Sequence, residues 1–397
     1  MSWKPRVTFA YVAYFSGIGA SFPYLPVFFL SLGLSLDAVG AIAALQAATQ
    51  LLAAPMWGGL ADRFPRSRLT HPAAALLAAS GAAILVVAGG IEGALIGAVV
   101  LAAGIAGTGP VLDARVLELL GPERGRFGSF RAWGSAAFVV SATLVGIALD
   151  RLGARAMFAI YVPALLLTTA AIVSLPARPV TRSVSILRGA SSIVGAPRMG
   201  LFLGGVFLVL VSLTAVNAFY SIRIVTLGGG DALVGLTWAI GAMVEVPVML
   251  GFARLARRFG TERLIVVGSL SLALRAAGAA ATADPIALLA IQTLEGFGFA
   301  CFLVGGVTYL AGRAPAGLAA TAQGLFAAVA GLATVVGSAL GGLAADRFGI
   351  SGLFAVGAVL GLGSAGVIAI ALRGSTITAA TLPVVAATTG PSGGQAG

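Results

Sequence analysis

The sequence predicts an all-helical membrane protein with twelve transmembrane helices arranged as two pseudo-symmetric six-helix bundles. Three observations support this fold class. Of 397 residues, 59% are hydrophobic and only 9% are charged, whereas about 25% are charged in a typical soluble domain. Twelve apolar stretches are each long enough to cross a hydrocarbon core of about 30 Å. In addition, short motifs recur at a spacing close to 195 residues, which indicates a duplicated unit.

The apolar stretches define the predicted helices in order. The first contains Pro23 and Pro26 and is too long for the hydrophobic region of a signal peptide, so we expect it to remain as a span. The twelve stretches begin near Val7, Ala38, Pro72, Ala94, Phe127, Ala156, Met199, Val234, Leu264, Ile286, Leu318 and Gly352. Twelve spans of roughly 20 residues each need about 240 residues, which leaves room for turns, a connector and a tail.

The basic residues predict the topology. If the amino end lies inside, 17 of the 24 Lys and Arg residues fall on cytoplasmic segments, three fall outside and four lie within spans. Cytoplasmic loops of membrane proteins carry such an excess of positive charge. We therefore expect a multi-pass protein of the cell (cytoplasmic) membrane with both termini in the cytoplasm. The net charge of +11 then reflects topology and not a nucleic-acid partner.

Two repeated motifs indicate how the chain is divided. GIALDRLG around Asp150 and GLAADRFG around Asp346 are 196 residues apart, and LDAVG at Gly40 and DALVG at Gly235 are 195 apart. We expect a six-helix bundle over residues 1–175, a cytoplasmic connector over 176–198, a second bundle over 199–373 and a disordered, uncharged tail over 374–397. A duplicated unit is typical of secondary transporters, whose solute site lies between the repeats.

The residue inventory excludes several kinds of chemistry. A phosphate-binding P-loop needs a lysine, and the only lysine is Lys4 at the amino end, so this chain has no ATP motor of its own. A single cysteine, Cys301, and a single histidine, His71, cannot form a disulfide, a Cys/His zinc site or a Ser-His-Asp triad. We therefore expect no enzyme activity, no metal and no cofactor.

The segment GGLADRFPRSR resembles the loop signature of the major facilitator superfamily, with Pro65 in place of the usual glycine. The resemblance implies the major facilitator fold and a cytoplasmic latch that holds the outward-open state, with Asp62 as its acid. The residues that match this signature are Gly58, Asp62, Arg63, Arg66 and Arg68. The alternative is an ordinary positively charged cytoplasmic loop.

Three further segments resemble the phenylpropionate-permease and lactose-permease branch of proton symporters: FPYLP at 22–26, RAWGSAAF at 131–138 and GAMVEVP around Glu245. The resemblance implies substrate ligands at Asp113, Arg131 and Glu245 and a corresponding arginine at Arg275. The chain departs from the lactose-permease pattern at Glu295, Gly298, Phe138 and Ala330, which stand for a histidine, an acid, a tryptophan and a lysine. These departures argue against a lactose-type specificity.

The depths of the charged residues within the spans, counted from the nearest turns, also predict a site. Asp113 and Arg131 lie nine residues on either side of Pro122 in a cytoplasmic turn. At 1.5 Å per residue both lie ~13 Å from the turn, so we expect them to pair. The alternative is that Asp113 belongs to a polar cytoplasmic end of the fourth helix.

A second group of charges lies in the carboxyl-terminal half. Glu245 and Arg275 are each fifteen residues from Gly260, and Arg275 and Glu295 are each ten from Pro285, so all three share one depth. Two carboxylates that share one guanidinium leave a surplus negative charge, which favours protonation of one acid. We expect Glu295 to carry the proton, Glu245 to be a ligand or second acceptor, and Arg275 to tune both. A purely structural ion cluster is the alternative.

These predictions together describe a secondary active transporter that couples the symport of a small organic solute to protons by alternating access. The sequence does not decide whether the solute is an aromatic acid, a sugar or a nucleoside. Phe22, Tyr24, Trp133 and Phe138 could line an aromatic-acid site or serve only in packing. The alternatives are a proton-driven efflux carrier and a non-transporting receptor or scaffold. The expected partners are the solute, protons and the lipid bilayer, and we expect a monomer.

Overall fold

The structure, a computed structural model, describes residues 3–63, 69–176, 198–314 and 318–373. Within these ranges the chain forms helices and no strand. All of the predicted connector except its end residues, and the whole predicted tail over 374–397, lie outside the described residues. The all-helical prediction is confirmed.

The first six spans are built from eight α-helices and two short 3₁₀ turns. The first span is divided at Pro23 into two helices, because proline has no N–H for the helix ladder. The fourth span is also divided, between Ile105 and Thr108. The elements are α1 (Trp3–Ser21), α2 (Leu25–Ser31), α3 (Leu36–Arg63), α4 (Thr70–Val87), α5 (Ile91–Ile105), α6 (Thr108–Leu120), η1 (Gly121–Arg126), α7 (Phe127–Leu152), η2 (Ala154–Ala156) and α8 (Met157–Ser174).

The remaining six spans are formed by five helical elements: α10 (Met199–Thr226), α11 (Asp231–Phe259), α12 (Thr261–Ala281), α13 (Pro285–Arg313) and α14 (Ala319–Leu372). Helix α14 contains two spans, since Gly349 has a left-handed φ of 71° and breaks the helix there. Only glycine adopts this conformation readily. Eleven apolar segments of the described chain are long enough to cross a membrane, and the last of them has 52 residues. Because this last segment is divided at Gly349 into two spans, the eleven segments give twelve membrane crossings.

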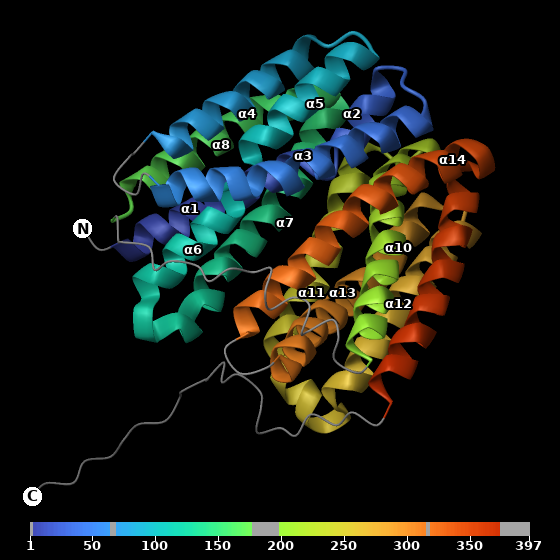
Figure 1. Ribbon diagram of the computed structural model, residues 1–397. Coiled ribbons are helices and arrows are strands. Elements are labelled where there is room, and N and C mark those ends of the chain that lie inside the picture. The colour runs from blue at the N-terminus through green and yellow to red at the C-terminus, as the bar shows by residue number, and fades with distance from the viewer. Residues whose placement is uncertain (1–2, 64–68, 177–197, 315–317, 374–397) are drawn as a thin grey trace, which may run out of the picture.

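The two sets of helices form two bundles that converge at one end and diverge at the other (Figure 1). The chain start and the end of α8 lie together, since Arg6 Nη1 donates to the Ser174 carbonyl at 2.9 Å. Arg198 before α10 likewise donates to the carbonyl of Arg373 after α14. We call this side the terminal end, and the opposite side, which contains Gly153, Gly230 and Gly349, the distal end.

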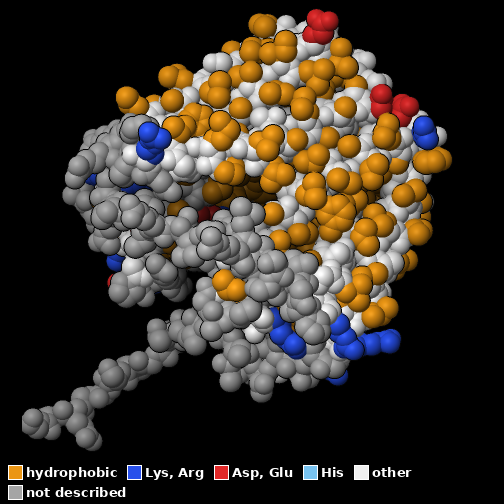
Figure 2. Space-filling view, viewed as in Figure 1, with side chains coloured by type: hydrophobic (Ala, Val, Ile, Leu, Met, Phe, Trp, Pro, Cys, Tyr) orange, Lys and Arg blue, Asp and Glu red, His pale blue; other side chains and the backbone are white. Residues whose placement is uncertain are grey.

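The bundles contact each other near the distal end. Helix α7 packs on α11, and α3 packs on α14. Gly40 and Gly342 bring the backbones of α3 and α14 together, because a Cβ at either position would collide with the other helix. Toward the terminal end the helices separate, and Figure 2 shows a recess between the bundles with an acidic side chain visible inside it. The structure is therefore closed at the distal end and open at the terminal end.

The outer surface is apolar, as a bilayer requires. Large hydrophobic side chains such as Leu52, Val87, Leu250 and Val359 are exposed, and hydrophobic side chains cover the visible face of the molecule (Figure 2). Such an extensive apolar surface is stable in lipid and not in water. The polar and charged side chains of the spans are therefore the ones that need an explanation.

Candidate solute and proton site

The amino-terminal bundle contributes a half-exposed ion pair. Arg131 of α7 lies 3.4 Å from Asp113 of α6, as their equal depth predicted. The Tyr11 hydroxyl donates to Asp113 Oδ1 at 2.7 Å, and the Arg131 guanidinium lies 5.1 Å from the centre of the Phe15 ring. The two charged side chains are 47% and 35% exposed. Water and a small solute can therefore reach this pair from the recess.

The carboxyl-terminal bundle contributes a buried guanidinium. Arg275 of α12 is only 1% exposed. Its Nη1 donates to Asn217 Oδ1 at 2.7 Å and its Nε donates to Gln292 Oε1 at 3.0 Å. The Tyr220 ring lies 4.1 Å from the guanidinium carbon, a distance at which a cation is attracted to the ring face. Nη2 has no hydrogen-bond partner among the described residues.

One acid, Glu295, lies beside Gln292, the amide that binds this guanidinium, and a second acid, Glu245, lies on the neighbouring helix. Glu295 of α13 is 8% exposed, and its Oε2 is 3.5 Å from Gln292 Nε2. Helices α11 and α13 cross closely at Gly241, where a Cβ would lie 3.1 Å from Glu295 Oε2. A Cβ at Gly296 would lie 3.0 Å from the backbone nitrogen of Glu245, so Glu245 of α11 lies next to the turn of α13 that carries Glu295. Glu295 and Arg275 thus both contact the amide of Gln292, and Glu245 lies on the helix that packs against Glu295.

The predicted sharing of one guanidinium by two carboxylates does not occur in this structure. Among the described residues the only salt bridges within 4.0 Å are Arg131–Asp113 and Arg126–Glu123. The reason is that Asn217 and Gln292 accept the hydrogen bonds of Arg275 that a carboxylate would otherwise take. Arg275 therefore acts on Glu295 at a distance, through Gln292.

The charges of the two bundles also face each other. Arg131 acts electrostatically on Glu245, although the two residues belong to different bundles. Asp113 and Arg131 are partly exposed in the amino-terminal bundle, whereas Glu295 and Arg275 are buried in the carboxyl-terminal bundle. Asp113, Glu245 and Glu295 with Arg131 and Arg275 carry one surplus negative charge when all five are ionised.

Sequence reasoning missed Asn217, Gln292 and Tyr11, because none of the three carries a charge. A signal was present for Gln292, which precedes Glu295 by three residues and so lies on the same helix face. Asn217 and Gln292 are also amides within apolar spans, where an unpaired polar group is costly. Polar residues within spans, and not only charged ones, would have pointed to this cluster.

The predicted aromatic residues do not form one group. Phe138 lies two turns after Arg131 on α7 and is half-buried, whereas Trp133 is 59% exposed and lines a separate recess with Val12, Ser16, Val140, Leu144 and Ile160. Tyr24 is fully buried and its hydroxyl donates to the Ala142 carbonyl. The Phe22 ring contacts the Trp238 ring of the other bundle at 4.9 Å. Of the four, Phe138 is the one placed on the Arg131 side of α7.

The predicted latch lies at the terminal end. Gly58 and Arg63 belong to the last turns of α3, and Arg63 is exposed. Arg66 and Arg68, as well as the side chain of Asp62, lie outside the described residues. The role of this segment as a latch stays a prediction.

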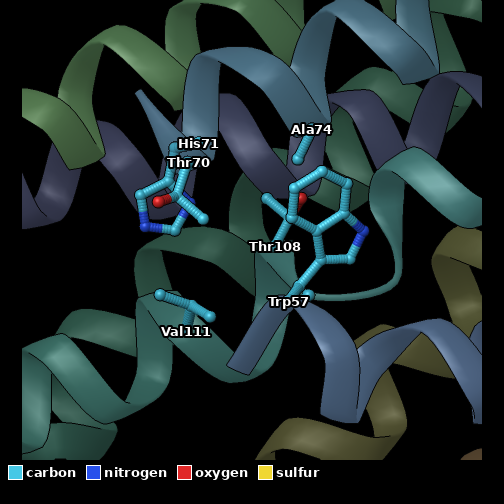
Figure 3. A pocket seen from close by; sticks show the side chains of 7 residues that line it. Trp57, Thr70, His71, Ala74, Thr108 and Val111 are labelled. Carbon is cyan, nitrogen blue, oxygen red and sulfur yellow. The ribbon is translucent and has the colours of Figure 1, made fainter. Parts of the chain in front are cut away.

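A small pocket lies between α3, α4 and α6 (Figure 3). Its lining includes Trp57, His71, Thr108 and Val111, and its volume of about 10 Å³ is room for about one water molecule. The Trp57 indole N–H donates at 2.6 Å to the carbonyl of Ala103, next to the break between α5 and α6. Trp57 thus satisfies a backbone group beside this break. The pocket is too small for an organic solute.

A family model described as "MFS_1 like family" matches residues 5–356. The chain belongs to this family. It is 28% identical over 349 residues to a maltose permease of Geobacillus stearothermophilus, and the match covers 87% of this chain and 88% of that protein. It is also 31% identical over 163 residues, 40% of each chain, to a homologue of the multi-drug resistance efflux pump PmrA from Lactococcus lactis subsp. lactis (strain IL1403).

Solved structures show the same fold. The nucleoside transporter NupG matches with a TM-score of 0.82 at 15% identity, over 94% of this chain and all of that chain. An auto inhibited peptide transporter of the POT family matches with a TM-score of 0.76 at 14% identity, over 95% and 98% of the two chains.

The major facilitator prediction is confirmed, and the chain is a membrane transporter of this type. This finding favours a transporter over the receptor or scaffold alternative. The branch within the superfamily stays a prediction.

Proposed function

We propose that this transporter couples the symport of a small, neutral, polar solute of the sugar class to protons. The observation that carries this proposal is the environment of Glu295, a buried acid beside Glu245 that has no salt-bridge partner within 4.0 Å among the described residues. A buried carboxylate without a cation in direct contact is costly in a membrane. Protonation removes that cost, and loss of the proton restores it.

The charge balance of the site supports a neutral solute. One bound proton neutralises the surplus negative charge between the bundles, so a neutral solute leaves the loaded carrier without net charge in this region. An anionic or cationic solute would add a charge during the change of access. The similarity to a maltose permease over most of both chains supports the sugar class among the three classes that the sequence left open.

The orientation belongs to the same proposal. The excess of Lys and Arg on the segments at the terminal end favours a cytoplasmic location for that end. The state described here would then be open to the cytoplasm.

Uptake by the purified protein in liposomes tests the proposed function. The solutes are maltose, glucose, a nucleoside and phenylpropionate, each with an inward proton gradient and with the gradient collapsed by a protonophore. We expect accumulation of a sugar only while the gradient is present. Accumulation of another class would contradict the substrate assignment, and gradient-independent equilibration would contradict proton coupling.

A proton-driven efflux carrier is the second candidate, because part of the chain is 31% identical to a homologue of a multidrug efflux pump. Export of lipophilic cations favours acids without arginine partners. Here Arg131 is paired with Asp113 and Arg275 acts on Glu295. Extrusion of a lipophilic cation from loaded liposomes, driven by protons that move into the liposomes, would support the efflux carrier instead.

A further inference from the structure

At the distal end, one bundle caps a helix of the other. Asp150, in the last turn of α7, accepts hydrogen bonds from the backbone N–H groups of Asp231 at 2.7 Å and Ala232 at 3.2 Å. These are the first two residues of α11. Gly230, which precedes them, has no side chain to cap its own helix, and a Cβ there would lie only 2.8 Å from Asp150 Oδ1. The carboxylate of α7 therefore serves as the cap of α11.

Such a cap has a definite energetic meaning. The first N–H groups of a helix have no partner within the helix, and a carboxylate at this position both accepts their hydrogen bonds and complements the helix dipole. The donor and the acceptor here belong to different bundles. Both hydrogen bonds must break when the bundles separate at the distal end. The cap therefore stabilises only the state that is closed there.

The neighbouring seam is tightly packed. A Cβ at Gly146 or at Gly235 would collide with the Tyr24 hydroxyl and with the opposite helix, so α7 and α11 lie in close backbone contact just below Asp150. Asp150 itself is exposed at the edge of this seam. Its position suits an acid that can leave the cap into water when the seam opens.

The internal repeat provides a natural comparison. Asp346 occupies the place of Asp150 in the second half, and LDAVG at the start of α3 matches DALVG at the start of α11. Nevertheless Asp346 is exposed, and it has no hydrogen-bond partner in the described part of the chain. At that seam the backbones of Gly40 and Gly342 meet instead. Two acids equivalent in sequence thus differ in what they contact.

We propose that Asp150 is a positioning residue of the transport cycle, which holds the distal end shut by capping α11 from the other bundle. Asp346, its repeat counterpart, has no such role. This inference requires alternating access, but it depends neither on protons nor on the solute.

The test measures how often the distal end opens, without any solute. Ser338, which is 4% exposed beside the α3–α14 seam, is changed to cysteine as a reporter that reacts with a maleimide only when the seam opens. The native Cys301 is fully buried, and the protein without the reporter gives the background rate. The reporter protein is then compared with Asp150→Ala, Asp150→Asn and Asp346→Ala in detergent.

Loss of a helix cap costs ~0.5–2 kcal/mol, which corresponds to a roughly two- to thirty-fold change in an equilibrium. We expect Asp150→Ala to raise the labelling rate by such a factor. Asp150→Asn should have a smaller effect because its amide oxygen still accepts one hydrogen bond. Asp346→Ala should leave the rate unchanged. An unchanged rate in Asp150→Ala, or an equal increase in Asp346→Ala, would overturn the proposal.

A second reporter separates opening of this seam from general loosening. In this second reporter, Ser135 of α7 is changed to cysteine. Ser135 lies about one turn after Arg131 and is half-buried. We expect Asp150→Ala to raise the labelling of the Ser338 reporter but not of the Ser135 reporter. A rise at both sites would mean that the variant only destabilises the protein, and it would overturn the assigned role. If Asp150→Ala fails to fold, Asp150→Asn provides the same comparison.

Discussion

The two bundles differ in the exposure and in the partners of their charged side chains. In the amino-terminal bundle, Asp113 and Arg131 form a direct salt bridge that is open to water. In the carboxyl-terminal bundle, Arg275 is almost fully buried and binds two neutral amides, while Glu295 next to Gln292 has no direct partner of opposite charge in the part of the chain that the structure describes. In the proposed mechanism the buried acid exchanges the proton and the exposed pair binds the solute.

The comparison predicts the largest effects on transport when either of the two arginines, Arg275 or Arg131, is replaced. Removing the charge of Arg275 leaves Glu295 without a nearby cation, and the loss of one partner of a buried charge network costs ~3–5 kcal/mol. We expect Arg275→Gln to lower gradient-driven accumulation by roughly 100-fold or more. Arg131→Gln should mainly raise the KM for solute, by about tenfold, since a hydrogen bond to a charged group contributes ~1.5–3 kcal/mol.

The KM is measured from initial rates of uptake over a range of solute concentrations. The accumulation is measured as the final level of gradient-driven uptake. The exposed Arg347 is the control, because Arg347→Gln should change neither. If both arginine variants altered only KM, the two bundles would not have the separate roles in proton coupling and in solute binding that we propose.

A smaller effect is expected at the amide between Arg275 and Glu295. Gln292→Leu keeps most of the side-chain volume but removes the hydrogen bond to Arg275 and the donor that faces Glu295. We expect accumulation to fall by about tenfold, the size of one or two hydrogen bonds. Gln323→Leu is the matched control, since Gln323 is a half-buried amide of α14 that donates to the Val307 carbonyl. Equal effects of the two changes on accumulation would argue against a special role for Gln292.

The smallest effect concerns the stability contributed by the exposed pair. Because Asp113 and Arg131 are 35% and 47% exposed, water screens their attraction. A double-mutant cycle with Asp113→Asn and Arg131→Gln should give a coupling below about 1 kcal/mol in the free energy of unfolding. A coupling of several kcal/mol would mean that the pair is structural, which would remove the contrast between the bundles.

Much of this architecture could be predicted because membrane spans follow simple rules of length and charge. Counting residues from Pro122 predicted the contact between Asp113 and Arg131, and counting from Pro285 predicted that Arg275 and Glu295 lie at one depth, where both contact Gln292. Depth along a helix does not determine the direction of a side chain, however. The neutral partners of Arg275 depend on how α10, α12 and α13 rotate against each other, which residue counts do not reveal.

The aromatic residues illustrate the same limit. Trp133 lies two residues after Arg131, and a helix turns by about 200° over two residues, so the two side chains point to opposite sides of α7. Phe138 lies seven residues after Arg131 and returns to nearly the same side. The resemblance to a family motif grouped these residues by sequence, whereas the helix period separates them. The cap on α11 likewise depends on the approach of two bundles, which no local pattern encodes.

The most direct test of the central claim compares two kinds of flux in Glu295→Gln. The amide resembles a protonated acid that cannot lose its proton, so the loaded carrier should still change access while the coupling step is blocked. We predict that solute exchange across liposomes without a gradient stays within about threefold of the unmodified protein. Accumulation driven by a proton gradient should disappear. If Glu295→Gln still concentrated solute to the level of the unmodified protein, Glu295 could not be the proton carrier.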